Sequence, residues 1–366
     1  MTEQTNYKRI LVLATHCIGD SLLVTMLTRN LRNQYPDAQI DVLVTARGRL
    51  VFESNNDVNE LIDFPQRPKI KDYYRFLQHH GRYDLVINER ITDRTAVYCW
   101  LFGRSRLGVV DESLTGAWFK KWVYNHRILE RTNSEHKMSR MARLLQQIQV
   151  NVEPRIQSPQ AALPQALLQE LPKDYIVVHA PSSNEIKQWP VEYWIQAIKS
   201  LLGLGYFIVL TGAPSERDSH IVSEIVSQLP NQGRLMSLLG QLSFAQTGTL
   251  LANCQGFVGP DSGPGHLAAG FSIPIISLIS VAPASKWSPW PYGLEVDVQD
   301  NLYTNRIPVK QVHDNVTVLQ SDRECVPCDG NRCKVSNELF SPCLRDITPQ
   351  RVVEAVVDAI PLKDSV

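Results

Sequence analysis

The sequence predicts an α/β protein with two doubly wound domains that face each other across a cleft. Short apolar runs, which are typical of buried parallel strands, alternate with segments of helical periodicity. This alternation occurs twice, on either side of residues 151–174, where four prolines indicate a linker. The 366 residues are enough for two full cores, and 43% hydrophobic and 20% charged residues are typical of a folded chain.

The first half of the chain begins with a β-loop-α-β unit. The apolar run at residues 10–14 predicts a parallel strand, and the helix that follows it ends before Pro36. Further strands are expected at residues 40–44, 61–64 and 84–88, and further helices around residues 73–79, 93–102 and 137–149. The loop before the first helix has one glycine, Gly19, where a dinucleotide fingerprint needs three, so a nicotinamide or flavin enzyme is disfavoured.

The second half repeats the alternation after one short helical turn in the linker. Strands are expected at residues 175–179, 207–210, 254–258 and 273–278, the last of them completing the series. Helices are expected at residues 191–202 and 217–228, with a shorter one beginning at His266.

Charge and cysteine content restrict the cellular setting. The formal net charge is zero, yet residues 67–143 contain 16 Lys and Arg against 8 Asp and Glu. A basic face for a phosphorylated glycolipid or a membrane surface is one explanation, and a solvated face without a partner is the other. We expect no nucleic-acid partner. The polar start, the lack of a long apolar run and the seven cysteines favour a cytoplasmic protein.

The segment at residues 259–269 has the features of an anion-binding turn. Ser262 or Gly263 is a plausible N-cap for the short helix that follows, whose first-turn N–H groups would face a phosphate. His266 would add a donor, and Asp261 lies at the carboxyl end of a strand, where open α/β sheets bind ligands. An ordinary strand-turn-helix corner is the alternative.

Asp20 is the candidate general base of the first domain. It follows the first strand, at the edge of the sheet where a carboxylate could accept a proton from a bound hydroxyl. On position alone, an N-cap role in the following helix is the better interpretation.

Loops of the second domain supply candidate donor-binding residues. Lys187, Ser182 and Ser183 share one strand-exit loop, and an ammonium with hydroxyls and backbone amides suits a diphosphate. In the next loop, Gly212 precedes Glu216, whose carboxylate could accept hydrogen bonds from ribose hydroxyls. The alternatives are a surface lysine and a first-turn helix carboxylate.

Four segments, taken together and in order, resemble glycosyltransferase family nine, the heptosyltransferases that build the inner core of bacterial lipopolysaccharide. They are residues 18–20, 187–190, 211–216 and 261–269. The resemblance extends from about residue 8 to residue 360.

The resemblance implies a GT-B fold of two Rossmann-like domains and an inverting, metal-independent transfer from ADP-heptose to a lipopolysaccharide-type acceptor. It gives Asp20 the role of base, Lys187 that of diphosphate ligand and Glu216 that of ribose ligand. It places the donor motif on Asp261, Ser262, Gly263, Gly265 and His266. Family members usually carry a bulkier residue where this chain has Gly265, and that difference concerns the fit of the donor sugar.

The implied domains are residues 1–165 for the acceptor, residues 166–347 for the nucleotide-sugar, and residues 348–366 as a C-terminal helix returning to the first domain. The enzyme is expected in the cytoplasm, with peripheral contact at the cytoplasmic face of the inner membrane. The acceptor contacts are expected in residues 46–51 and 89–95, while acceptor identity and oligomeric state are left open. A sugar-nucleotide epimerase and a non-catalytic nucleotide-sugar-binding protein are the alternatives.

Four cysteines near the C-terminus form a separate candidate site. Their spacing, C-x₂-C-x₄-C-x₉-C, could place thiolates tetrahedrally around a structural zinc ion. Unmetallated thiols or a reversible disulfide are the alternatives. The residues are Cys325, Cys328, Cys333 and Cys343.

Overall fold

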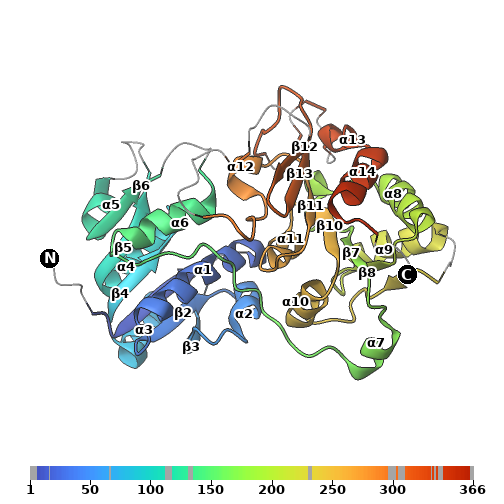
Figure 1. Ribbon diagram of the computed structural model, residues 1–366. Helices are drawn as coiled ribbons and strands as arrows, with labels where there is room; N and C mark the ends of the chain where they lie inside the picture. The colour runs from blue at the N-terminus through green and yellow to red at the C-terminus, as the bar shows by residue number, and fades with distance from the viewer. Residues whose placement is uncertain are drawn as a thin grey trace. The chain divides into compact units, whose positions relative to one another are not determined.

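The protein, represented here by a computed structural model, divides into two compact units (Figure 1). The first comprises Met1–Gln157 with Glu295–Asp300, and the second comprises Ser158–Leu294 with Asn301–Val366. The division after Gln157 precedes the expected boundary at residue 165. The structure describes residues 6–15, 17–65, 67–111, 118–130, 135–229, 233–295, 302–303, 310–330, 332–333, 335–336 and 341–362.

The first unit is built on a parallel sheet with the strand order β3-β2-β1-β4-β5-β6. The order reverses between β1 and β4, which is the arrangement of a doubly wound sheet. The sequence-based expectations identify β1 to β4 and miss β5 and β6. The strands are β1 (Arg9–Ala14), β2 (Gln39–Val44), β3 (Glu60–Asp63), β4 (Tyr83–Asn88), β5 (Gly103–Val110) and β6 (His126–Leu129).

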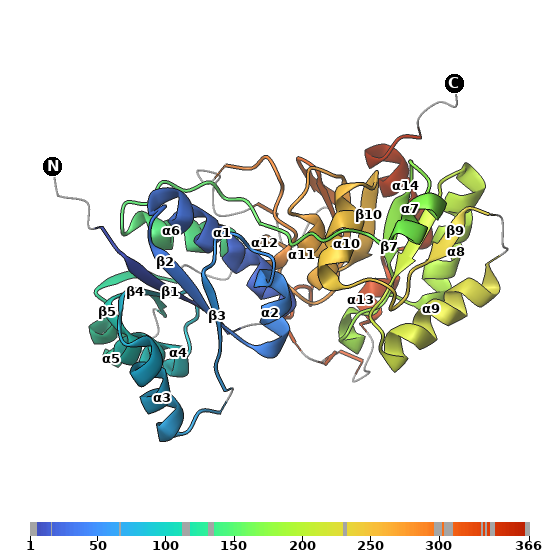
Figure 2. The same ribbon diagram turned by 90° about the horizontal axis from the view of Figure 1, so that it is seen from below.

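Two groups of helices cover this sheet. One group packs on it through an apolar core rich in aromatic rings, in which Phe76 and Phe102 stack with centroids 3.8 Å apart. This group consists of α3 (Ile70–His80), α4 (Asp93–Phe102) and α5 (Trp118–Val123), which lie side by side in Figure 2. The other group, in which α1 contacts both partners, consists of α1 (Ile18–Gln34), α2 (Ala46–Phe52) and α6 (Lys137–Gln146).

One glycine of β5 makes room for a buried ring. A Cβ added at Gly108 would overlap the ring of Tyr124, so the ring lies directly against the strand backbone. The Tyr124 hydroxyl accepts a hydrogen bond of 2.7 Å from Asn88 Nδ2. Tyr124 thus joins the start of β6 to both β4 and β5.

The second unit contains a seven-stranded sheet in the order β12-β13-β11-β10-β7-β8-β9, parallel except for the antiparallel edge strand β12. The sequence-based series ended at β11, so the expectation that this strand is the last is wrong: β13 and β12 extend the sheet beyond it. The strands are β7 (Ile176–His179), β8 (Ile208–Thr211), β9 (Leu235–Ser237), β10 (Gly256–Pro260), β11 (Ile275–Ile279), β12 (Lys310–His313) and β13 (Val316–Gln320).

Helices on both faces of this sheet complete the unit. Trp189 and Trp194, both fully buried, pack edge to face at 4.7 Å in its core. The helices are α7 (Gln165–Glu170), α8 (Val191–Leu204), α9 (Glu216–Gln228), α10 (Phe244–Ala252), α11 (Gly263–Ala268), α12 (Ala284–Trp287), α13 (Pro342–Arg345) and α14 (Pro349–Ala359). Among the described residues, no helix combines the length and apolarity needed to span a bilayer.

The C-terminal helix α14 packs within the second unit, which corrects the expectation that it returns to the first domain. Val352, Val356 and Ile360 belong to the same core as α8 and the strands of the second sheet. The α14 helix contacts α8, β11 and β13. The apolar stripe is real, but its partner is the adjacent helix α8, which presents Leu201 and Leu202 to the same core.

Candidate functional site

The candidate donor site lies where the parallel strands of the second sheet end. Lys187 closes a short 3₁₀ turn, Glu185–Lys187, after β7, and Asp261 directly follows β10. The Lys187 ammonium lies 2.6 Å from Asp261 Oδ2. The Asp261 side chain is 5% exposed and that of Lys187 is 28% exposed, so the ammonium is the accessible member of the pair. The structure therefore brings together two residues that the sequence predicts for one site.

The loop that carries Lys187 is held by contacts that the sequence analysis missed. Gln188 accepts a hydrogen bond from the Ser182 amide at 2.8 Å and donates to the Ala180 carbonyl. The Ser341 hydroxyl donates to the Ile186 carbonyl at 2.6 Å. These hydrogen bonds fix the backbone on both sides of Lys187. The contact of Ser341 spans 155 residues, so the local sequence could not predict it.

Arg217, also missed, links the loop after β7 to the start of α9. Its Nε donates to the Ser182 carbonyl at 2.7 Å, and its Nη1 lies 3.3 Å from Glu185 Oε1. Glu216, the first residue of α9, is exposed, and among the described residues its carboxylate has no hydrogen-bond partner. The candidate ribose ligand thus lies beside the loop that contains Ser182 and Lys187.

The remaining donor-motif residues occupy α11 and the turn before it. Ser262 is the N-cap residue, and Gly263 begins the helix. The Ser262 hydroxyl does not cap the helix, is buried, and forms no hydrogen bond within the described part of the chain. His266 is buried in α11. A Cβ at Gly265 would meet no atom closer than 3.7 Å, so crowding does not require glycine there.

Two other predicted residues differ in what surrounds them. Ser183 is exposed at the surface of the loop after β7, whereas Ser182 is buried. A Cβ at Gly212 would lie 2.8 Å from the side chain of Leu239, which gives this glycine a packing role. Asp218, which the sequence analysis missed, secures the loop after β8 by accepting hydrogen bonds from the Ala213 amide and the Ser215 hydroxyl.

His179, at the end of β7, contributes no positive charge to this edge of the sheet near neutral pH. Its Nδ1 lies 3.0 Å from the Thr211 hydroxyl. Burial lowers the pKa of His179 to about 4, and the charge of Asp218 opposes this shift. Lys187 is therefore the cation that the loop after β7 presents.

In the first unit, Asp20 is the third residue of α1, and Cys17 occupies the N-cap position. The N-cap interpretation of Asp20 is therefore wrong. Its Oδ1 lies 3.5 Å from Lys137 Nζ, and its side chain is 25% exposed. Asp20 thus reaches the surface near the carboxyl end of β1, next to a cation.

Lys137 belongs to a buried charge network that the sequence analysis missed. Its ammonium lies 3.9 Å from Glu89 Oε1, and Arg140 pairs with Glu89 at 2.8 Å and with Glu130 at 2.6 Å. Glu89 and Arg140 are buried, so each requires the other. The spacing of Lys137 and Arg140, one helical turn apart on α6, was the feature of the sequence that could have indicated this network.

A pocket of about 610 Å³ lies at the same edge of the first sheet. It is lined by Arg90 and Arg94 and by hydroxyls that include those of Thr15 and Thr45. The Arg90 Nη1 donates to the Thr15 carbonyl at 2.6 Å, whereas its Nε and Nη2 make no hydrogen bond within the described chain. Residues 90 and 92–95 line this pocket, in line with one of the two segments expected to contact an acceptor.

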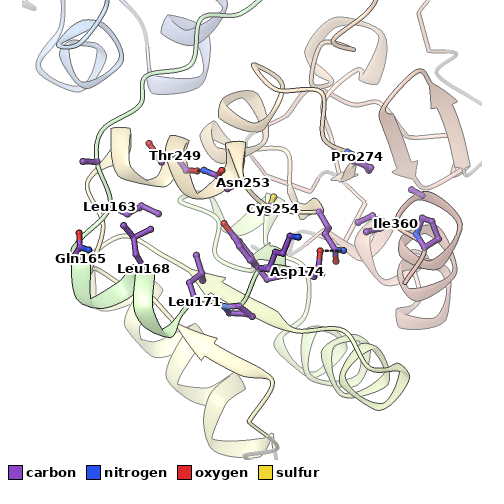
Figure 3. Close-up of a pocket in the computed structure, with 17 residues that line it drawn as sticks. Leu163, Gln165, Leu168, Leu171, Asp174, Thr249, Asn253, Cys254, Pro274 and Ile360 are labelled. Carbon is purple, nitrogen blue, oxygen red and sulfur yellow. Dashed lines mark hydrogen bonds between the residues drawn. The ribbon is translucent and has the colours of Figure 1, made fainter. Parts of the chain in front are cut away.

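A larger pocket of about 990 Å³ lies elsewhere in the second unit (Figure 3). Asp174, Cys254 and Pro274 line it, and each precedes a strand of the sheet. It therefore opens near the amino ends of β7, β10 and β11, whereas Lys187 and Asp261 follow the carboxyl ends. Ligands of open α/β sheets bind at the carboxyl ends, so its size does not make it the donor site.

The four C-terminal cysteines were expected to bind a structural zinc ion. None of them is in a disulfide; Cys343 is buried while Cys325 is exposed. Within the described ranges, no three His, Cys, Asp or Glu residues are grouped so as to bind one ion. Burial raises the pKa of the Cys343 thiol to about 11, and a hydrogen bond with Ser341 opposes this shift.

Two doubly wound units, with ligand-binding candidates at the carboxyl edge of the second sheet, are the arrangement of the GT-B fold. The chain belongs to glycosyltransferase family 9 (heptosyltransferase), whose model matches residues 76–337. The family and fold expected from the sequence are thereby confirmed.

Individual relatives agree with this assignment. The chain is 28% identical over 291 residues to lipopolysaccharide heptosyltransferase 3 of Escherichia coli K12, covering 74% of this chain and 82% of that protein. A family 9 glycosyl transferase from Veillonella parvula matches with a TM-score of 0.75 and 18% identity, over 98% and 99% of the chains. The E. coli ADP-heptose lps heptosyltransferase II matches with a TM-score of 0.69 and 21% identity, over 96% and 98%. At these identities, the two structures show the fold alone.

Proposed function

We propose that this enzyme transfers a heptose, or a related sugar, from ADP-heptose to a hydroxyl of a lipopolysaccharide-core or similar glycolipid acceptor. Family membership and the relatives named for lipopolysaccharide heptose transfer support the class of reaction. The name of the structural relative that includes ADP-heptose supports the donor.

The observation that carries the donor assignment is the Lys187–Asp261 ion pair at the carboxyl edge of the second sheet. An ammonium has three donors, and the contact with Asp261 leaves others for phosphate oxygens. The buried hydroxyl of Ser262, which has no hydrogen-bond partner among the described residues, is adjacent in sequence to Asp261, and a phosphate oxygen would satisfy it. Glu216, exposed on the neighbouring loop, is assigned to the ribose.

The acceptor is assigned to the first unit, at the pocket lined by Arg90 and Arg94. Two guanidinium groups and several threonine hydroxyls suit an anionic sugar, because arginine binds phosphate through paired hydrogen bonds. This chemistry favours a phosphorylated glycolipid acceptor.

The proposed reaction is a single displacement that inverts the anomeric carbon. Asp20 removes the proton of the acceptor hydroxyl, whose oxygen then bonds to the anomeric carbon. The bond from that carbon to the diphosphate oxygen breaks, and ADP leaves with the electron pair. Lys187 stabilises the negative charge that develops on the diphosphate, so we propose that the step requires no metal ion.

We place this activity at the cytoplasmic face of the inner membrane, where a nucleotide-sugar and a lipid-linked acceptor would meet.

The deciding experiment is incubation of the purified protein with ADP-heptose and truncated lipopolysaccharide, followed by mass spectrometry of the acceptor. We expect a mass increase of one heptose, and NMR of the product should show an inverted anomeric configuration. The same reaction with added chelator should proceed at the same rate. ADP-heptose that is consumed without any gain of mass by the acceptor would contradict the proposal.

A further inference from the structure

Three neighbouring helices of the first unit expose aromatic side chains. Tyr74 on α3, Trp100 on α4 and Trp122 on α5 are 70%, 56% and 83% exposed. They are the only large aromatic residues that are exposed within the described ranges. Ile70, one helical turn before Tyr74, is 88% exposed. We call these four residues the α3–α5 face.

The α3–α5 face is the outward side of a well-packed layer. The inward sides of the same helices place Phe76, Tyr98 and Phe102 in the core against the sheet. The aromatic rings on the outside therefore have no role in that core. The three helices are neighbours (Figure 2), because Phe76 of α3 stacks on Phe102 of α4 and α4 contacts α5.

The charge around the α3–α5 face is positive. Lys71, Arg75 and Lys121 are exposed, and in the described structure none of them forms an ion pair. The three helices together contain five Lys and Arg residues against two Asp residues, of which Asp93 pairs with Lys120 at 2.7 Å. These helices therefore carry an excess of positive charge.

We propose that the α3–α5 face binds the surface of an anionic lipid bilayer. Tryptophan and tyrosine favour the interface between acyl chains and headgroups, because each has an apolar body and a polar tip. Lysine and arginine beside them are attracted by anionic headgroups. The biological role of this binding rests on the proposed function, since it would bring the enzyme to a membrane-embedded acceptor.

Charge complementarity favours a bilayer over a protein partner as the occupant. The cores of protein interfaces are depleted in lysine, whereas here Lys71 and Lys121 lie on the same short helices as the exposed rings. Rings with surrounding lysines are the combination used by proteins that lie on anionic membranes.

The test uses the full chain and vesicles that contain no glycolipid acceptor, so the outcome does not depend on the proposed reaction. Flotation is compared between phosphatidylcholine vesicles and vesicles of equal parts phosphatidylcholine and phosphatidylglycerol. We expect binding to the anionic vesicles only, reduced about tenfold or more in a Trp100→Ser, Trp122→Ser variant. Lys71→Gln and Lys121→Gln should each weaken binding about fivefold.

A matched control replaces exposed apolar residues of the second unit, Leu168→Ser and Leu204→Ser, and should bind as the parent does. Brominated lipids should quench the fluorescence of the parent and not that of the double tryptophan variant. Transfer to a delipidated, soluble acceptor should be unchanged in that variant, which also shows that it is folded. Equal binding by parent and double tryptophan variant, or a parent that ignores anionic vesicles and self-associates through these tryptophans instead, would overturn the proposal.

Discussion

Lys187 Nζ lies 2.6 Å from Asp261 Oδ2, so a single ion pair connects the loops that follow β7 and β10. The pair holds a flexible lysine at the edge of the sheet before a donor arrives. Holding it there reduces the entropy that the side chain would lose on binding a phosphate. The carboxylate therefore acts as the positioning residue and the ammonium as the ligand.

Replacing Lys187 by alanine should weaken ADP binding about ten- to a hundredfold, because one charged contact to phosphate is lost. Calorimetry with ADP measures this directly. Lys199→Ala, which removes an exposed lysine from α8, is the control and should bind ADP as the parent does. Unchanged affinity in Lys187→Ala would show that the nucleotide binds elsewhere.

Asp20→Asn should lower turnover about 10²–10⁴-fold, because the amide cannot accept the acceptor proton. Donor affinity should stay the same, since the nucleotide is assigned to the second unit. Stability should fall by at most about 1 kcal/mol, from the contact with Lys137 and the helix dipole.

The matched control for Asp20 is Asp72→Asn, because Asp72 is likewise the third residue of its helix, α3. Its turnover on a soluble acceptor should equal that of the parent. A folded Asp20→Asn variant that transfers sugar at near-parent rate would rule out the role of Asp20 as base.

Gly265→Ala should raise the free energy of unfolding by about 0.5–1 kcal/mol, because alanine is the better helix residue. The nearest atom to its new Cβ would be 3.7 Å away. Gly248→Ala on α10 should instead destabilise, because the Pro159 carbonyl occupies the place of the Cβ. Denaturant titration measures the free energy of unfolding of both variants. A change of the same sign in the two variants would contradict the prediction.

His179 should make stability depend on pH below neutrality. Burial lowers its pKa to about 4, so between pH 6.5 and 4 the unfolded chain binds a proton that the folded chain does not. The contribution of His179 to the free energy of unfolding is therefore fully present above pH 6.5. It is lost as the pH falls toward 4, which lowers the free energy of unfolding by at most about 3 kcal/mol. In unfolding titrations at several pH values, His179→Gln should remove this dependence of the free energy of unfolding on pH. The control His220→Gln, which replaces an 82% exposed side chain, should leave it unchanged.

The C-terminal cysteines should bind no stoichiometric zinc, because the described side chains do not assemble around one ion. Elemental analysis of protein purified without chelator should give less than about 0.2 zinc per chain. A value near one, lost in a Cys343→Ser variant, would restore the expectation drawn from the spacing.

Local sequence patterns predicted most strands and helices, because buried parallel strands are continuous apolar runs such as residues 10–14. β5 was missed because arginines at positions 104 and 106 interrupt its first half. The packing partner of α14 was not predicted. An amphipathic stripe shows that one side of a helix is buried, but it does not identify the element that buries it.

The candidate site was predictable only in part, for a similar reason. Lys187 and Asp261 were found because each follows an evident strand, and ends of neighbouring parallel strands meet at one edge. Arg217 and Ser341 act on backbone carbonyls far away in sequence, with separations of 35 and 155 residues, and carry no local pattern. Glu89 and Arg140 pair across 51 residues for the same reason.

The contact of Tyr124 with the backbone of Gly108 has a consequence for how this protein can change over evolution. Any side chain at position 108 would require a smaller one at position 124, because the two share one volume. A smaller residue at position 124 alone would leave a void, and the Asn88 side-chain amide would lose the hydroxyl that accepts its hydrogen bond. Substitutions at positions 88, 108 and 124 are therefore coupled, and relatives that differ at one of these positions should differ at another.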